Sequence, residues 1–371
     1  MKSRFEIQNE LISRNESAFT HFLNNIETIK DDSETVLDIF DDNIFSFAKK
    51  KNWGFYSILS CKSVFKNDTV YKTALIGKKS EKNIALYVTD YDKPLKLSGD
   101  ITFLGDIKVP NSRIEQAYIN GVSGNKVKIK GKQLKSQDKL PKIDKEILIN
   151  LNNYSTETIK NETTVFVNSF SNKTIVINFE ELKKLDKATL KGNIILTSNK
   201  SITIDNSLAI NDILIVAPKV YVKKGFNGNA QIIAKTEVDI EEDVSLTYPS
   251  SIYVKNDIDS VNVSIKKNTI IAGGIVINGN TYKGSLKRSL TIAEGSKIIG
   301  NVYCYGKTQL KGTIIGSIYS DRFFLKTASS NYENTILNAS INRDSLPKSF
   351  VELPLFKTNI DKANYEVLKT F

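Results

Sequence analysis

Large apolar residues recur at every sixth position through the middle of this chain. The residue two places after each of them is also aliphatic or small. Side chains that point inward at every second residue are typical of a β-strand, so each block of six predicts a short strand followed by a corner. The recurring positions are Leu190, Leu196, Ile202, Leu208, Leu214, Val220, Phe226, Ile232, Val238 and Val244.

Three such blocks make a coil of about 18 residues, and coils of equal length stack like residues on like. This offset would place Ile202, Val220 and Val238 in one column. Pro218 and Gly225 fall at corners, where a missing N–H or a positive φ is tolerated. We therefore expect a mainly β fold whose main body is a triangular parallel β-helix, and we expect it to be right-handed.

The stretch ILIVAPKVYV (213–222) contains two aliphatic runs with no Asn-Gly or Asp-Gly pair between them. A two-residue hairpin favours such a pair, so we expect the two runs to form adjacent sides of one coil. Further along, Ile298-Ile299-Gly300 recurs as Ile314-Ile315-Gly316, which indicates that coils continue to that point.

Residues 4–30 have the apolar periodicity of an amphipathic helix. So broad an apolar face needs a cover, which its own domain, a partner helix or a membrane interface could supply. An acidic stretch then surrounds a short helical pattern, TVLDIF. The helical stripe is Ile7, Leu11, Ala18, Phe22, Ile26 and Ile29, widened by Phe5, Ile12, Phe19 and Leu23, and the acids are Asp31, Asp32, Glu34, Asp38, Asp41 and Asp42.

These patterns divide the chain into four parts. The stretches NWGFYSILSCKSVF, VYKTALIGKK and NIALYVTDYDKPLKL predict a small antiparallel β region, with Trp53, Phe55 and Tyr56 in a core. The parts are an amphipathic helix (1–30), a small α+β adaptor domain (31–94), the parallel β-helix (95–345, interrupted by a polar insertion at about 125–165) and a C-terminal cap or tail (346–371).

The net charge of +11 over 371 residues is compatible with anionic partners such as glycans, lipid head groups or nucleic acid. The lysines are scattered and are not interleaved with aromatic residues, so we expect no specific nucleic-acid binding. No run of 18 apolar residues and no signal-peptide pattern is present. If the natural form is membrane-tethered, the segment responsible would lie upstream of Met1.

The candidate chemistry is sparse. Acyltransferases built on six-residue β-helix repeats need a catalytic histidine between coils, and the only histidine here is His21, on the predicted helix. Cys61 and Cys304 have no metal-like spacing, so two free thiols are the simplest interpretation, with a disulfide or a redox role as alternatives. We assign no catalytic, cofactor-binding or metal residue, and we expect no cofactor.

Carboxylates are the remaining enzymatic candidates, because polysaccharide-cleaving β-helices use carboxylates, or a Lys or Arg base with Ca²⁺, on one outer face. The outer positions of the coils must be polar in any case, so solvated corners explain these residues equally well. The candidates are Asp239, Glu241, Glu242, Asp243, Asp257 and Asp259.

Two resemblances add to this picture. The segments KIIGNVYCYG and TIIGSIYSD resemble bactofilins, small cytoplasmic β-helices that polymerise end to end. The order NWGFY, LSGD, AYINGVSG, GNIILTS, APKVYV and LTYPSSIYV is similar to an uncharacterised family of bacterial envelope proteins. That family carries an N-terminal, pilin-like membrane segment ahead of a β-helix, and this chain lacks that segment. The resemblance implies no catalytic residues.

The function we expect is that of a non-enzymatic structural or binding protein of the bacterial cell envelope. It would be a β-helix stalk or scaffold, tethered through its N-terminal helix and located in the envelope or periplasm, with other envelope proteins or anionic glycans as partners. The alternatives are a β-helix polysaccharide-active enzyme or glycan-binding protein, and a bactofilin-like filament former in the cytoplasm.

Overall fold

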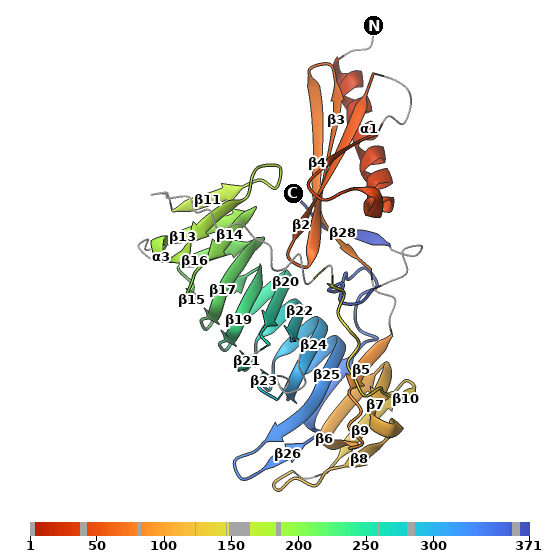
Figure 1. Ribbon diagram of the computed structural model, residues 1–371, viewed down its shortest axis with the longest axis vertical. Helices are drawn as coiled ribbons and strands as arrows, with labels where there is room; N and C mark the ends of the chain where they lie inside the picture. The colour runs from red at the N-terminus through yellow and green to blue at the C-terminus, as the bar shows by residue number, and fades with distance from the viewer. Residues whose placement is uncertain are drawn as a thin grey trace.

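The computed structural model describes residues 4–37, 43–79, 83–122, 124–145, 147, 164–182, 187–257, 260–279, 286–357 and 364–371. Within these ranges the protein is mainly β with an N-terminal helix. It consists of two bodies, which we call the head and the stack (Figure 1). The head holds a five-stranded antiparallel sheet, and the stack holds a 20-stranded and a three-stranded sheet built almost entirely from parallel pairs.

The head is one helix packed on one sheet. Its sheet order is β1-β2-β3-β4-β28, and α1 crosses β3 and β4. The 3₁₀ turn Ile26–Thr28 follows the helix and packs into the same core. The elements are α1 (Arg4–Asn24), β1 (Glu34–Leu37), β2 (Phe45–Trp53), β3 (Tyr56–Phe65), β4 (Asp68–Lys78) and β28 (Tyr365–Thr370).

The head sheet covers the apolar face of α1. Of the alternatives that the sequence left open, the helix therefore packs on its own domain. Five of the six stripe residues are buried, and their partners on the sheet include Leu59 and Ile76. Phe5 and Ile12 do not widen this face, because they are 72% and 47% exposed. The buried stripe residues are Leu11, Ala18, Phe22, Ile26 and Ile29.

The helical interpretation of TVLDIF is wrong where the structure describes it. Glu34–Leu37 forms the strand β1, which pairs antiparallel with β2. β-branched Thr35 and Val36 suit an edge strand better than a helix this short. Asp38, Asp41 and Asp42 lie outside the described residues.

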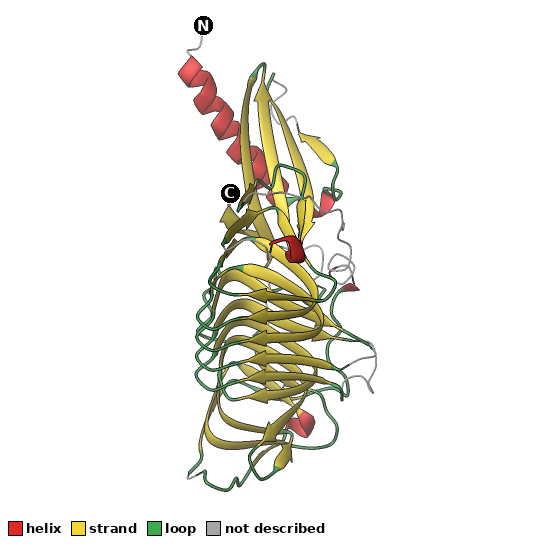
Figure 2. Cartoon of the chain, turned by 90° about the vertical axis from the view of Figure 1, so that its left-hand side faces the viewer, coloured by secondary structure: helices red, strands yellow, loops and turns green. Residues whose placement is uncertain are grey.

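The stack consists of short strands lying one above another, below the head (Figure 2). Short helical turns occur at Pro110–Ser112 and α3 (Phe179–Leu182). The strands are β5 (Ile84–Val88), β6 (Leu95–Leu104), β7 (Asp106–Val109), β8 (Ile114–Gln116), β9 (Lys126–Lys130), β10 (Gln133–Lys135), β11 (Val165–Asn168), β12 (Ile175–Asn178), β13 (Ala188–Gly192), β14 (Ile194–Thr197), β15 (Ser201–Ile204), β16 (Leu208–Asn211), β17 (Ile213–Val222), β18 (Asn227–Gly228), β19 (Ala230–Ile240), β20 (Ser245–Lys255), β21 (Val261–Ile265), β22 (Ile270–Asn278), β23 (Arg288–Ile292), β24 (Lys297–Leu310), β25 (Thr313–Lys326), β26 (Asn331–Glu333) and β27 (Thr335–Asn342).

The predicted columns of the core are confirmed. Ile202 pairs with Val220, and Val220 pairs with Val238, in parallel register across β15, β17 and β19. The two runs of ILIVAPKVYV form a single strand, β17, whose first half pairs with β14 and whose second half pairs with β15. The register shifts between Ala217 and Lys219, so Pro218 sits at an irregularity and no hairpin forms.

The six-residue series fails at one position. Ile213 and Ile215 belong to the inner core, whereas Leu214 belongs to a second cluster on the outside of the stack. The offset between paired residues changes here, because Leu196 pairs with Ile215 rather than with Leu214. Leu214 is nevertheless fully buried. The apolar spacing of the sequence therefore cannot show whether a residue belongs to the inner core or to the outer cluster.

The repeated Ile-Ile-Gly segments lie directly against each other. Ile298 pairs with Ile314 and Gly300 with Gly316, and Gly273 continues the glycine column on the other side. Gly300 has a φ of 121°, and a Cβ there would lie 1.9 Å from the carbonyl oxygen of Gly273. Only glycine fits such a close approach of backbones, which explains why the motif recurs.

The spatial order of the strands differs from the chain order. β5 pairs with β25 and β6 pairs with β27, so residues 84–104 stack beyond residues 313–342. The stack therefore begins at Ile84, inside the range expected for the adaptor domain, and NIALYVTDYDKPLKL forms parallel rather than antiparallel pairs. β9 and β10 also belong to the stack, although they fall within the expected insertion at 125–165.

Two segments cover one outer face of the stack. Residues 136–145 run along its side, and residues 351–356 lie beside them. Leu140, Ile143 and Leu353 contribute to the cluster that contains Leu214 and the outward tyrosines of the strands. Residues 351–356 thus lie on a side face of the stack, and residues 365–370 form β28 in the head sheet.

The head and the stack meet at the turn between β2 and β3. The side chain of Gln231 accepts a hydrogen bond from the backbone N–H of Phe55 at 2.8 Å and donates one to the carbonyl oxygen of Trp53 at 2.8 Å. Trp53, Phe55 and Tyr56 are buried as predicted, in the core that joins the two bodies. Since β4 leads into the stack and β28 returns from it, the stack is an insertion in the head sheet, and both chain ends lie at the head (Figure 1).

Candidate functional site

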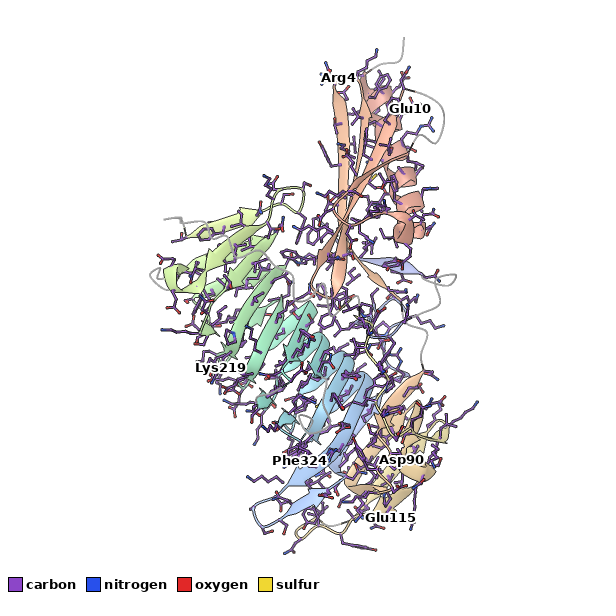
Figure 3. All side chains as sticks on the ribbon, viewed as in Figure 1. Arg4, Glu10, Asp90, Glu115, Lys219 and Phe324 are labelled. Carbon is purple, nitrogen blue, oxygen red and sulfur yellow. The ribbon has the colours of Figure 1, made fainter. Side chains whose placement is uncertain are left out.

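Four of the six carboxylates considered as catalytic candidates contact lysines of neighbouring levels of the stack. Lys223 pairs with Glu241 at 2.9 Å, and Lys266 pairs with Asp239 at 2.9 Å. Lys219 and Glu237 add a pair at 3.1 Å, and Figure 3 shows Lys219 on the outer side of the stack. The remaining candidates of this cluster, Glu242 and Asp243, both contact Lys224, at 3.5 and 3.3 Å.

This pairing makes Glu241 a poor proton acceptor. The hydrogen bond from Lys223, with a second from the backbone N–H of Lys224, lowers the pKa of Glu241. A general base works best with a pKa near the working pH, so the shift is in the wrong direction for catalysis. Asp257 follows β20, apart from these pairs, and Asp259 lies outside the described residues.

The histidine and the cysteines do not form a reactive cluster. His21 is exposed on α1. Cys61 and Cys304 are free and buried, as the simplest interpretation of the sequence has it, and burial raises the pKa of each thiol to about 12. Within the described ranges, no group of three or more His, Cys, Asp or Glu residues could hold a metal ion. No helix in those ranges is long and apolar enough to cross a membrane.

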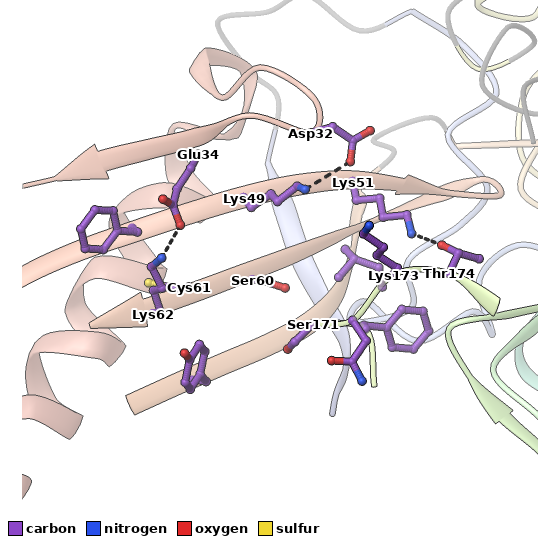
Figure 4. Close-up of a pocket in the computed structure, with 15 residues that line it drawn as sticks. Asp32, Glu34, Lys49, Lys51, Ser60, Cys61, Lys62, Ser171, Lys173 and Thr174 are labelled. Atoms are coloured by element: carbon purple, nitrogen blue, oxygen red, sulfur yellow. Dashed lines mark hydrogen bonds and ion pairs between the residues drawn. The ribbon is translucent and has the colours of Figure 1, made fainter. Parts of the chain in front are cut away.

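A cavity of about 490 Å³ lies where the head meets the stack, and we call it the junction groove (Figure 4). One wall is the face of the head sheet that is turned away from α1. The other wall is the loop between β11 and β12, which includes Phe170 and Lys173. The groove is thus built from two segments, residues 32–71 and 170–174, that lie far apart in the sequence.

The alternation of β2 explains the chemistry of the sheet wall. In the stretch FSFAKKKNW, Phe47, Lys49 and Lys51 line the groove, whereas Ala48 is packed in the core under α1. Successive side chains of a strand point to opposite faces, so every second lysine of the KKK run reaches the groove. Ser60 and Lys62 reach it from β3 by the same rule.

Among the described residues that line the junction groove, positive charge exceeds negative charge. Lys49, Lys51, Lys62 and Lys173 line it, against the two carboxylates Asp32 and Glu34. Lys62 pairs with Glu34 at 2.6 Å, and Lys49 lies 3.8 Å from Asp32. No ion pair of Lys173 is found in the part of the chain that the structure describes. An anionic group would therefore enter a site with spare positive charge.

Lys51 is a half-buried cation held by neutral oxygens. Its ammonium donates to the hydroxyl of Thr174 and to Oδ1 of Asn193, the latter at 3.3 Å. Burial lowers the pKa of Lys51, although the nearby charge of Asp32 opposes the effect. The ammonium also lies 5.6 Å from the centre of the Trp53 ring. Its buried position and its lowered pKa mean that a nearby anion would stabilise its charged form.

Sequence reasoning missed this groove. The lysines contribute to the net charge of +11, but the sequence does not show that residues 47–62 face residues 170–174. The KKK run inside an alternating strand was the available signal, since it breaks a pattern in which one face should be apolar.

Comparisons with known proteins do not assign this chain to a family. No family model and no curated protein matches the chain. One solved structure, the competence-associated pilin ComZ from Thermus thermophilus, aligns over 92% of this chain and 86% of its own, with 10% sequence identity and a TM-score of 0.24. The chain thus has only a weak structural likeness to a pilin, and that likeness carries no functional argument.

Proposed function

We propose that this is a non-enzymatic structural or binding protein of the bacterial cell envelope, in which the stack is a triangular, right-handed parallel β-helix that serves as a rigid scaffold. The observation that carries the proposal is the insertion of the stack into the head sheet between β4 and β28. The two chain connections at β4 and β28 and the contacts of Gln231 hold the two bodies together. Such a construction suits a stalk fixed at one end.

The ion pairs that these carboxylates form support a non-enzymatic role. Asp239, Glu241, Glu242 and Asp243 each contact a lysine of a neighbouring coil, so they stabilise the stacking of coils. Exposed ion pairs of this kind stabilise a fold only weakly. The enzymatic alternative would require these groups to leave their lysines.

The junction groove supports binding of an anionic glycan. Lysine ammonium groups form charge-assisted hydrogen bonds with carboxylates and phosphates, and these are stronger than neutral hydrogen bonds. Lys49, Lys62 and Lys173 stand at the groove wall, and Phe47 and Tyr71 give it an apolar part against which a sugar ring could pack. A glycan with acidic groups uses both features.

The proposed tether acts through the exposed side of α1. The buried side of the helix is occupied by the head sheet, so Phe5 and Ile12 are the apolar residues left for an attachment. The bactofilin-like alternative is disfavoured by the terminal strand β9, whose Lys126, Lys128 and Lys130 are exposed. Lysines on a terminal strand oppose the edge-to-edge stacking that a filament needs.

Binding of polygalacturonate to the full chain tests the proposal. We expect binding that weakens steeply with salt, and we expect Lys49→Ala with Lys173→Ala to weaken it by about tenfold or more. The matched control is Lys126→Ala with Lys128→Ala, which removes the same charge from the far end of the stack. Equal losses in both pairs would show diffuse attraction and contradict a defined groove.

Further measurements distinguish the proposed function from nucleic-acid binding and from an enzymatic role. A single-stranded DNA oligonucleotide of equal charge should bind more weakly than polygalacturonate, and tighter binding would point to nucleic acid instead. Release of new reducing ends from the polysaccharide would contradict the non-enzymatic role. Fractionation of cells that express the chain or its Phe5→Ser, Ile12→Ser variant tests the tether, which requires membrane association to fall in the variant.

A further inference from the structure

Outward-facing tyrosines form a ladder along one face of the stack. Tyr303 pairs with Tyr319, and Tyr319 pairs with Tyr87, across β24, β25 and β5. The rings of Tyr87 and Tyr319 are stacked with their centres 6.0 Å apart. Segments 136–145 and 351–356 cover much of this face. Tyr305, two residues beyond Tyr303 and therefore on the same face, is only half-buried.

A cavity of about 450 Å³ lies at this point, between the ladder and segment 136–145, and we call it the tyrosine pocket. Its wall includes Tyr91, Tyr303 and Tyr305, with Leu140 and Ile143 from the covering segment. The volume falls in the range of small-molecule sites, about 300–1,000 Å³. The pocket shares no lining residue with the junction groove.

Asp321 supplies a polar group in this aromatic setting. It is only 1% exposed, and it lines the pocket. Its Oδ1 accepts a hydrogen bond from the Tyr91 hydroxyl at 2.6 Å, and its Oδ2 accepts two from the guanidinium of Arg322, each at 3.1 Å. A carboxylate offers about four acceptor positions, so Asp321 retains capacity for a ligand hydroxyl. The buried amide of Asn278 adds a second polar group.

The rim of the pocket is basic. Lys139, Lys142 and Lys145 are exposed on the covering segment, and among the described residues of the lining Asp138 is the only carboxylate apart from Asp321. None of the three lysines forms an ion pair within the described parts of the chain. These lysines would meet an acidic substituent of a ligand that enters from solvent.

We propose that the tyrosine pocket binds a sugar unit that carries a carboxylate or phosphate group. Aromatic rings present a negative face to the C–H groups of a sugar. The acceptors of Asp321 and Asn278 suit hydroxyl donors, and the lysine rim suits the acidic substituent. The inference does not depend on the junction groove, since it rests on other residues.

Saturation-transfer NMR and calorimetry on the full chain test this inference, with glucuronate, glucose 6-phosphate and glucose as probes. We expect both acidic sugars to bind more tightly than glucose, and Tyr305→Ala to weaken all three by about fivefold or more. Lys142→Ala should weaken the acidic sugars and leave glucose unchanged. The two acidic probes distinguish a carboxylate preference from a phosphate preference.

Matched controls keep the result interpretable. Tyr118→Ala removes a tyrosine that is 84% exposed elsewhere, and Lys126→Ala removes a distant exposed lysine. Equal effects from these controls, or no saturation transfer from any probe, would overturn the inference. If Tyr305→Ala fails to fold, the exposed Lys142→Ala still decides, because a surface lysine can be removed without loss of packing. If the Lys49→Ala, Lys173→Ala variant loses polygalacturonate binding, that loss concerns the junction groove and not the tyrosine pocket.

Discussion

Lys369, near the C-terminus, forms an ion pair with Asp212 of the stack, with its ammonium 2.8 and 2.7 Å from the two carboxylate oxygens. Asp212 is 8% exposed and has a positive φ of 61°. Its backbone N–H donates to Oδ1 of Asn229. The last strand of the head sheet is thus bound to the stack by an ion pair whose carboxylate is buried and whose lysine side chain is 37% exposed.

Removing the cation of this pair should cost more than removing both charges. We expect Lys369→Met to lower the free energy of unfolding by about 2 kcal/mol, because Asp212 would keep a buried charge without a partner. The double variant with Asp212→Asn should recover most of the loss. Urea denaturation of both variants measures the free energy of unfolding. An unchanged midpoint for Lys369→Met would show that the ion pair does not stabilise the fold.

Gly54 sits in the turn that joins the head to the stack, and a Cβ at this position would lie 2.1 Å from Oε1 of Gln231. Its φ of 64° adds a cost for any other residue. We expect Gly54→Ala to destabilise the protein by about 2 kcal/mol or more. In a Gln231→Ala background the clash disappears, so the same change should then cost only about 1 kcal/mol. A double-mutant cycle by thermal denaturation checks this, and additive effects would contradict it.

Phe226 belongs to the inner core and is 2% exposed. Phe226→Asp should lower the free energy of unfolding by several kcal/mol, or prevent folding, because it buries an unpaired charge. Lys224→Ala is the control at the neighbouring corner, where an exposed ion pair contributes little to stability. Circular dichroism melts compare the two. Similar midpoints for both variants would mean that Phe226 is not in the core.

Stability should fall as the pH rises above about 9. Burial raises the pKa of Cys304 from 9.0 to about 12, so the unfolded chain loses this proton at lower pH than the folded protein. The stabilisation is complete below pH 9 and is lost between pH 9 and about 12. Cys61 is shifted in the same direction.

The measurement is the urea midpoint at pH 8 and at pH 10.5, with Cys304→Ala as the comparison. This variant should lose stability at both pH values from the smaller side chain, yet show a smaller decline between them. At pH 8 neither thiol of the folded protein should react readily with a thiol reagent, since the thiolate is the reactive form. Rapid reaction of both would contradict the burial on which the pKa shifts depend.

The inner columns could be predicted because a parallel stack repeats one environment. Ile202, Val220 and Val238 occupy equivalent positions, so spacing alone identifies them. The outer tyrosine ladder could not be predicted, since its cover comes from segments 136–145 and 351–356, which are remote in sequence. Leu214 shows the same difficulty, because an apolar residue looks alike on either side of a covered strand.

The spatial order of the strands also could not be predicted from the sequence. A repeat indicates that coils stack, but every coil can in principle meet any other, so nothing local assigns β5 to β25. The same limit hid the junction groove, in which Lys51 of the head meets Thr174 of the stack. Alternation in β2 shows which side chains share a face, and the fold alone decides what stands opposite.

The pairing of β5 with β25 and of β6 with β27 has a consequence for biosynthesis. Residues 84–104 leave the ribosome long before residues 313–342, so one edge of the early strands has no partner while the rest of the chain is made. Non-local pairing of this kind folds slowly, and open edges promote aggregation. A nascent chain that stops short of Asn342 would therefore carry two unmatched edges, and premature termination should yield insoluble fragments rather than a shorter, folded protein.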